Sequence, residues 1–340
     1  MNKITNPTQK ITNDHGENHT YVFEENAKNA INAALLINRP LLIRGEPGVG
    51  KSQLAKAAAE ALGRAYIPFV INASTESQDL LWTFDAVARL ADAQIEGALC
   101  KTDKEKEEAR DRLALHRYLK PAALWIALNW KSAKEQYEDT HNPELSPLSG
   151  YQGDKNVEEN GVVLLIDEID KADSSVPNGL LEVLGSNRFH PEGLDKPIEV
   201  DGGVKPLIII TTNEERTLPD AFIRRCLSVT LGLPKQKAKQ IEYLVNHAKP
   251  NFTKLDRALN NDKDQTLLEA AAEMILEDRA QASQANLHPL PGQAEYFDLL
   301  RGIEKMLDDD QNNIEDVLSI MTQLSQFTSK KHPDFKQKDD

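Results

Sequence analysis

Residues 40–52, PLLIRGEPGVGKS, decide the fold. The apolar run at their start predicts a buried strand, and the Ala-rich stretch 51–63 predicts a helix that ends at Gly63. Between them lies the pattern G-x-x-x-x-G-K-S, whose fixed positions are Gly45, Gly50, Lys51 and Ser52. Glycines in a turn between a strand and a helix let backbone N–H groups face an anion at the helix N-terminus. The stretch therefore predicts a loop that binds phosphate.

The whole loop is the candidate nucleotide-binding element. Its residues are Gly45, Glu46, Pro47, Gly48, Val49, Gly50, Lys51 and Ser52. In this motif the lysine reaches the β- and γ-phosphates, and the hydroxyl of the next residue binds Mg²⁺. We therefore expect ATP and Mg²⁺ as cofactors, with Ser52 as a metal ligand. The alternative is a chance glycine-rich turn, against which the flanking strand and helix argue.

Further apolar runs predict the rest of a sheet. They lie at 65–72, 162–170, 207–215 and 227–233. Because strand, loop, helix and strand follow one another from residue 40, we expect a parallel sheet flanked by helices, an α/β fold. Residues 197–206 predict a hairpin that turns at Asp201, Gly202 and Gly203.

Two of these strands end in polar residues suited to phosphate chemistry. Asp167 and Glu168 follow five apolar residues, so Asp167 is a candidate Mg²⁺ ligand. Glu168 is a candidate base that orients and deprotonates a water aimed at the γ-phosphate. Asn213 ends the run LIIITTN and is a candidate for positioning the same water. The alternative interpretations are an ordinary acidic strand end and an ordinary turn.

Arg224 and Arg225 lie at the end of a predicted short helix, 218–226. Cations at a helix C-terminus complement the helix dipole, which is the common role of such a pair. The other interpretation is an arginine finger that enters the nucleotide site of a neighbouring subunit. The sequence leaves both interpretations open.

The strand pattern stops after Pro234, which predicts a domain boundary there. Helical stretches follow at 235–248, 265–284, 292–308 and 313–327. We expect the following division: a flexible segment at 1–20, an α/β nucleotide-binding domain at 21–233 with a helical insertion at about 80–160, a small all-α lid domain at 234–328, and a flexible tail at 329–340.

Composition narrows the class of protein. Of the 340 residues, 40% are hydrophobic and 28% are charged, which is typical of a soluble globular protein. The formal charge of −14 argues against a general polyanion binder. Cys100 and Cys226 are too few for a disulfide framework and lack metal-ligand spacing, so we expect a reducing, cytoplasmic compartment. No apolar window is long enough for a membrane span. Trp82, Trp125 and Trp130 are expected in the core.

The order of the motifs resembles the AAA+ ATPases and, within them, the MoxR-like group. The resemblance covers about residues 20–310 and rests on GEPGVGKS (45–52), LLIDEIDKAD (164–173), IIITTNEE (208–215) and LPDAFIRRC (218–226). It implies a P-loop NTPase sheet, the AAA+ core, followed by the helical lid. The long path between residues 72 and 162 resembles the insertion that marks this clade.

The resemblance also implies a role for each matching residue. Gly45 to Ser52 would be the Walker A loop, Asp167 and Glu168 the Walker B pair, Asn213 sensor 1, and Arg225 the finger with Arg224 as the second candidate. One position departs from the pattern. Many MoxR-like proteins have a lid arginine after a proline, called sensor 2, and here HPLPGQAEYF (288–297) has Gly292 at that position. Arg301 is the alternative candidate for the sensor 2 role.

The resemblance further implies a homo-oligomer, usually a hexameric ring, whose partner carries a von Willebrand factor A domain. The function would be chaperone-like remodelling or maturation of a protein. The alternative is a nucleic-acid-coupled AAA+ ATPase, such as a loader or a restriction-type translocase. The acidic charge and the absence of a basic helix-turn-helix argue against it. A scaffold with negligible turnover is a third class, against which Glu168 argues.

Overall fold

The computed structural model describes residues 3–12, 16, 18–99, 102–153, 155–200, 203–256, 259, 265–307 and 314–330, with only the backbone given for 314–316. The chain divides into two compact units. Unit 1 comprises Met1–Asn6, Glu25–Arg44 and Ala55–Val229, and unit 2 comprises Pro7–Glu24, Gly45–Leu54 and Thr230–Asp340. No single cut separates the units, because the phosphate loop belongs to the unit that contains the C-terminal helices.

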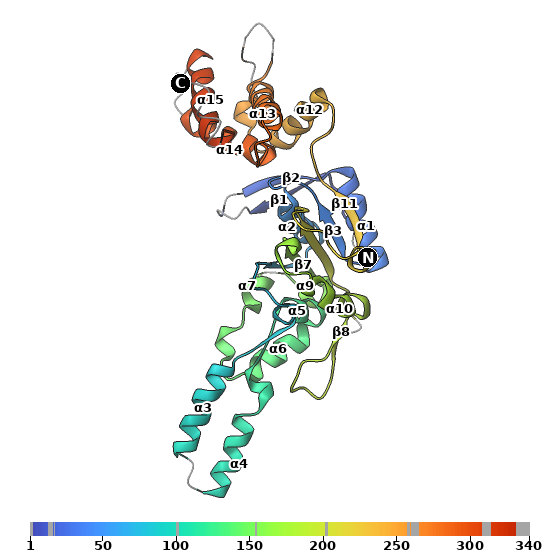
Figure 1. The fold of residues 1–340 in the computed structure, drawn as a ribbon, viewed down its shortest axis with the longest axis vertical. Helices are drawn as coiled ribbons and strands as arrows, with labels where there is room; N and C mark the ends of the chain where they lie inside the picture. The colour runs from blue at the N-terminus through green and yellow to red at the C-terminus, as the bar shows by residue number, and fades with distance from the viewer. Residues whose placement is uncertain are drawn as a thin grey trace. The chain divides into compact units, whose positions relative to one another are not determined.

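A five-stranded sheet forms the centre of unit 1 (Figure 1). Its strands are β3 (Leu41–Arg44), β4 (Ala65–Val70), β7 (Val162–Asp167), β10 (Leu207–Thr212) and β11 (Leu227–Thr230). Their order is β11-β3-β10-β7-β4, and the pairs β3–β10, β10–β7 and β7–β4 are parallel. Each strand lies within its predicted range, so the predicted α/β class with a parallel sheet is confirmed.

Both faces of the central strands are covered. Successive residues of a strand point to opposite faces, and every residue of β10 is buried. The same holds for β7 up to Ile166. The helices α1 (Glu25–Ile37) and α5 (Ala123–Leu128) pack on this sheet, α1 on β3 and α5 on β4 and β7. Continuous apolar runs such as VVLLI are therefore what the fold requires.

Parallel pairing brings the ends of four strands, β3, β10, β7 and β4, to one edge. Thr212 pairs with Arg44, and Val70 pairs with Asp167. Gly45 follows Arg44 directly in the chain. In open parallel sheets, ligands bind outside the carboxyl ends of the strands, and these are the ends at which the candidate residues lie.

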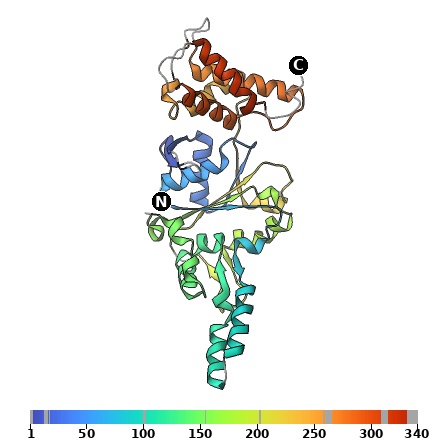
Figure 2. The ribbon, with the colours of Figure 1, turned by 90° about the vertical axis from the view of Figure 1, so that its left-hand side faces the viewer.

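The path between β4 and β7 is mostly helical, as predicted. It contains β5 (Trp82–Phe84), α3 (Ala86–Leu99), α4 (Asp103–Arg112), β6 (Leu119–Pro121), α5, α6 (Trp130–Asp139), α7 (Leu148–Gln152) and α8 (Val157–Asn160). The helices α3 and α4 lie side by side and extend away from the sheet of unit 1 in both views (Figure 1 and Figure 2). The strands β5 and β6 of this path form a small antiparallel sheet, which the sequence did not predict.

The three tryptophans belong to the core of this unit, as expected. Trp125 is only 1% exposed, while Trp82 and Trp130 are half-buried and pack against the same cluster. The ring of Phe189 stacks on Trp82 and meets Trp125 edge to face. Aromatic rings of the insertion therefore connect it to the segment that follows β7.

Short helices and strands follow β7 in unit 1. Between β7 and β10 lie α9 (Ser175–Gly179), α10 (Leu181–Ser186), β8 (Arg188–Phe189) and β9 (Ile198–Glu199), and α11 (Asp220–Arg225) follows β10. The strand β9 pairs with β8, which precedes it, so the predicted hairpin within 197–206 is wrong for Ile198 and Glu199. Asp201, Gly202 and Cys100 lie outside the described residues.

Unit 2 contains the C-terminal helices, and their region is helical as predicted. They are α12 (Lys237–Ala248), α13 (Leu267–Gln284), α14 (Gln293–Met306) and α15 (Ile314–Thr328). The phosphate loop and the start of α2 (Lys51–Leu62) belong to the same unit. None of the helices in the described ranges is long and apolar enough to cross a membrane.

Unit 2 also contains an N-terminal hairpin, formed by β1 (Thr8–Thr12) and β2 (Asn18–Val22). The side-chain amide of Asn251 binds the backbone of Thr20 twice. Its Oδ1 accepts from the Thr20 N–H at 2.6 Å, and its Nδ2 donates to the Thr20 carbonyl at 2.9 Å. Ile11 is buried. The expected flexible segment at 1–20 is therefore wrong for these strands, while residues 331–340 of the expected tail lie outside the described ones.

Replacing Trp125 with alanine should reduce the free energy of unfolding by about 3–5 kcal/mol, because it leaves a cavity where a fully buried ring was packed. Urea unfolding followed by far-UV circular dichroism measures this. The matched control is Leu99→Ala on α3, whose side chain is 67% exposed and should change stability by less than about 0.5 kcal/mol. Equal effects of the two substitutions would contradict the core assignment.

Candidate active site

The backbone of the phosphate loop requires glycine at three positions. Gly45, Gly48 and Gly50 have φ values of 151°, 79° and 86°, in the left-handed region that side chains disfavour. A Cβ at Gly45 would lie 2.3 Å from the carbonyl oxygen of Leu231, and one at Gly48 would lie 2.9 Å from Cβ of Ala294. The loop is therefore closely packed against residues of its own unit.

Lys51 is held on the loop that precedes it. Its Nζ donates to the carbonyl oxygens of Gly45 at 2.7 Å and Glu46 at 2.9 Å, and the residue is only 7% exposed. Lys51 and Ser52 are the first two residues of α2. A lysine ammonium, a hydroxyl and the N–H groups of a first helical turn form a donor set that suits a polyphosphate with its Mg²⁺. The residues present therefore fit the expected cofactors.

Asp167 and Glu168 are connected through Thr211 of β10. The Thr211 hydroxyl donates to Oδ1 of Asp167 and accepts from the backbone N–H of Glu168 at 2.9 Å. Thr211 is fully buried, so its hydroxyl sits between the two strands rather than in water. Sequence reasoning missed this residue, although the pair of threonines before Asn213 was a signal for it.

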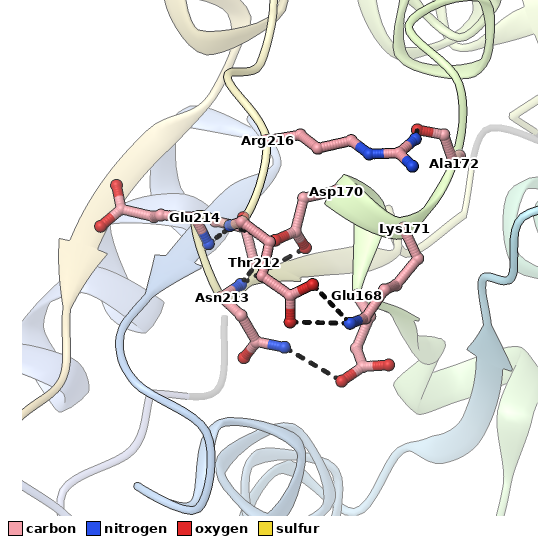
Figure 3. Close-up of polar contacts among 9 residues, drawn as sticks. Glu168, Asp170, Lys171, Ala172, Thr212, Asn213, Glu214 and Arg216 are labelled. Carbon is pink, nitrogen blue, oxygen red and sulfur yellow. Dashed lines mark hydrogen bonds and ion pairs between the residues drawn. The ribbon is translucent and has the colours of Figure 1, made fainter. Parts of the chain in front are cut away.

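Glu168 and Asn213 are brought together, as Figure 3 shows. The Asn213 Nδ2 donates to Oε1 of Glu168 at 3.0 Å. Glu168 itself has φ 58° and ψ 49°, a left-handed backbone that is uncommon for a residue other than glycine. This conformation ends β7 abruptly and turns the glutamate toward the neighbouring strand. Both residues were predicted from sequence to act on one water.

Asp170 is the support of this pair and was also missed. The residue is 2% exposed, and its carboxylate accepts the backbone N–H of Asn213 at 3.2 Å and that of Glu215 at 2.9 Å (Figure 3). A buried carboxylate needs such partners, because leaving it unpaired would be costly. The third acid of the run DEID could have identified it, since a buried acid so close to a strand end requires donors.

Charged residues surround the pair on its exposed side. Lys171 donates to both carboxylate oxygens of Glu215, at 2.7 and 2.6 Å, and these bonds raise the pKa of Lys171. Arg44 pairs with Glu214 at 2.9 Å between Nη1 and Oε1. These ion pairs hold the segment after β10 in place beside the end of β7. They engage Glu214 and Glu215, whereas the carboxylate of Glu168 accepts from Asn213.

Arg224 and Arg225 lie apart from this cluster, at the exposed end of α11. Arg225 donates from Nη1 to the carbonyl of Ala221 on its own helix at 3.3 Å. Arg39 donates to the backbone carbonyls of both arginines and so caps the helix end. Within the residues that the structure describes, neither arginine forms an ion pair with a carboxylate. The structure does not bring them to Glu168 or Asn213.

No group of three or more His, Cys, Asp or Glu side chains among the described residues could hold a metal ion. Mg²⁺ is commonly bound by one or two protein oxygens together with substrate phosphates, so such a cage is not required.

Burial raises the pKa of the Cys226 thiol to about 11, which keeps it protonated at neutral pH.

The comparison with known families agrees with this geometry. Residues 40–226, more than half of the chain, match the AAA domain of the dynein-related subfamily. The chain belongs to this AAA family. The match begins just before β3 and ends with α11, so it includes the phosphate loop, the acid cluster and the two arginines. Nucleotide binding and ATP hydrolysis are the general properties of AAA ATPases.

Individual relatives are more distant. A segment of 80 residues is 40% identical to midasin of Giardia intestinalis, which is 23% of this chain but only 2% of midasin. A variant of Thermotoga maritima RuvB has 16% identity and a TM-score of 0.46 over 92% of this chain and 73% of that one. The T. maritima RuvB Holliday junction branch migration motor has 16% identity and a TM-score of 0.41, covering 88% and 69% of the two chains.

Replacing Asp170 with asparagine should lower ATP turnover and reduce stability by about 1–3 kcal/mol, because one amide oxygen must replace two carboxylate oxygens that accept backbone N–H groups. Steady-state turnover and thermal unfolding measure the two effects. Asp195→Asn is the control, since Asp195 is exposed, and it should change neither. Native turnover in the Asp170 variant would show that Asp170 does not support Asn213.

Proposed function

We propose that this AAA protein is a Mg²⁺-dependent ATP hydrolase of MoxR type that forms a ring and remodels or matures a partner protein. The hydrogen bond between Glu168 and Asn213 carries the hydrolytic part of the proposal. It joins an acid and an amide at the carboxyl ends of neighbouring parallel strands. These two groups can orient one water and accept its proton.

The phosphate loop would bind the nucleotide. Lys51 would bind the β- and γ-phosphates, and the backbone N–H groups of residues 48–52 would donate to them. Ser52 and Asp167 would hold Mg²⁺, which neutralises charge on the phosphates. That the loop and the acid cluster serve the same nucleotide is part of the proposal, because they belong to different compact units.

Glu168 would act as the general base. Its carboxylate would accept a proton from water as the water oxygen attacks phosphorus, and Asn213 would hold both in line. Asn213 donates to the Oε1 atom of this carboxylate at 3.0 Å. The water would be bound by the other carboxylate oxygen, Oε2. Asp170 and Thr211 fix the backbone at the two strand ends, so the pair is preorganised.

Arg225, with Arg224 as the second candidate, would serve a neighbouring subunit. Both guanidinium groups are exposed on α11, and their helix is capped by Arg39 rather than by them. A guanidinium that is not engaged with a carboxylate can enter another subunit's site and meet the charge that develops on the γ-phosphate. This role implies a homo-oligomer, most simply the hexameric ring of MoxR-like proteins.

The proposed partner follows from the MoxR resemblance, and the proposed compartment follows from the small number of cysteines. A protein with a von Willebrand factor A domain would be the partner, and the cytoplasm the location. The acidic charge of −14 supports this class over a nucleic-acid-coupled motor. The ATPase rate with and without double-stranded DNA at low salt separates the two. No change supports the protein-remodelling class, and stimulation favours the motor.

Replacing Glu168 with glutamine should leave ATP binding intact and slow hydrolysis at least about a hundredfold, because the base is lost while the shape and the bond to Asn213 remain. Lys51→Ala should instead weaken nucleotide binding. Calorimetric titration with ATP and single-turnover hydrolysis measure the two properties. Glu182→Gln, at an exposed position of α10, is the control. Turnover near the native rate in the Glu168 variant would refute the assigned base.

Mixing two inactive variants tests the finger. Arg225→Ala lacks the finger and Lys51→Ala lacks the phosphate ligand, so some interfaces in a mixed ring should pair an intact loop with an intact finger and recover activity. An arginine that only complements a helix end contributes less than about 1 kcal/mol and should leave hydrolysis intact.

Two results would oppose the assignment. Mixed rings that form, as shown by light scattering with ATP and Mg²⁺, but remain inactive would rule out action between subunits. Native turnover of Arg225→Ala alone would transfer the role to Arg224.

A further inference from the structure

A lid arginine that the sequence did not single out contacts the phosphate loop. Arg279 of α13 donates from Nη2 to both carboxylate oxygens of Glu46, at 2.9 and 2.8 Å. Both residues belong to unit 2. The arginine side chain is 18% exposed and that of Glu46 is 53% exposed. A charge-assisted contact with both oxygens fixes direction as well as distance.

The same guanidinium also holds the start of α14. Its Nη1 donates to the carbonyl oxygen of Pro291 at 3.0 Å. The next residue, Gly292, is the N-cap of α14, and a Cβ built on it would lie 4.0 Å from the same Nη1. The guanidinium therefore occupies the space beside the position at which MoxR-like proteins have an arginine. Here the cation reaches that space from α13 instead.

A second contact joins α14 to the loop. Gly48 approaches Ala294, in the first turn of α14, so closely that a Cβ would meet that of Ala294 at 2.9 Å. Two points of the loop, Glu46 and Gly48, are thus held by helices α13 and α14. Arg301 does not take part, because it pairs with Asp298 on its own helix at 3.0 Å.

We propose that Arg279 is a positioning residue that neutralises Glu46 and couples α13 and α14 to the nucleotide in the phosphate loop. An unpaired carboxylate in this loop would repel the phosphates, and the guanidinium removes that repulsion. Because the same group holds Pro291, a loop that tightens around phosphate pulls on the start of α14. The inference rests on the proposed nucleotide binding.

A double-mutant cycle on the full-length protein tests the neutralisation. Arg279→Gln should weaken ADP binding about fivefold, the upper range for an exposed ion pair. Glu46→Gln should bind ADP at least as tightly as the native chain. In the double variant the arginine substitution should have almost no further effect, with affinity within about twofold of Glu46→Gln. Calorimetric titration with ADP measures all four proteins.

Hydrogen exchange tests the coupling independently of activity. In the native chain, ADP should slow exchange in peptides covering residues 267–306. Arg279→Gln and Glu46→Gln should each abolish that change while retaining protection of the loop peptide at saturating ADP. Glu46→Gln breaks the pair from the loop side, so the test survives if the Arg279 variant folds poorly. Lys305→Gln, at an exposed position of α14, is the control and should retain both native affinity and native protection.

An additive cycle overturns the proposal, and so does unaltered protection of residues 267–306 in both variants. Loss of protection with Lys305→Gln also overturns it, because the effect would then not be specific to Arg279. The failure of the proposed function has a different signature. In that case the native chain itself binds no ADP, and no cycle can be measured.

Discussion

Parallel pairing of β3, β10 and β7 is the constraint on which the rest of the structure depends. It brings the ends of three buried strands to one edge and so fixes which polar residues become neighbours. Thr211 can bridge Asp167 and Glu168 only because β10 is next to β7 in register. A shift of one residue would turn every side chain of β10 to the other face. The largely apolar strands stabilise this arrangement, because their side chains are buried on both faces of the sheet.

The sheet and its site were largely predictable, because apolar runs and polar strand ends are local signals. Each of the five strands lies within its predicted range, and Glu168 and Asn213 meet as their positions at strand ends implied. The residues that were missed have hydrogen-bond partners that are distant in the sequence. Asp170 is needed by backbone N–H groups more than forty residues away, and Arg279 by a carboxylate more than two hundred residues away. The spacing of residues along the sequence does not predict contacts over such separations.

The N-terminal hairpin shows a different limit of sequence reasoning. Its residues are polar enough to suggest a mobile end, and their strands are short. What orders them is Asn251, which lies beyond α12 and satisfies both backbone groups of Thr20. Composition describes what a segment can do alone, whereas this hairpin depends on a partner from the opposite end of the chain. The division into compact units follows from contacts of the same kind.

The left-handed backbone at Glu168 restricts which amino acids can replace this residue. Glycine and asparagine adopt such a φ readily, whereas valine, isoleucine and threonine do not. Position 168 therefore has two separate requirements: a side chain with the right chemistry and a residue that tolerates a left-handed backbone. A survey of all substitutions would show β-branched residues depleted even in a selection that asks only for folded protein. The chemical requirement emerges only from the residues that the backbone accepts.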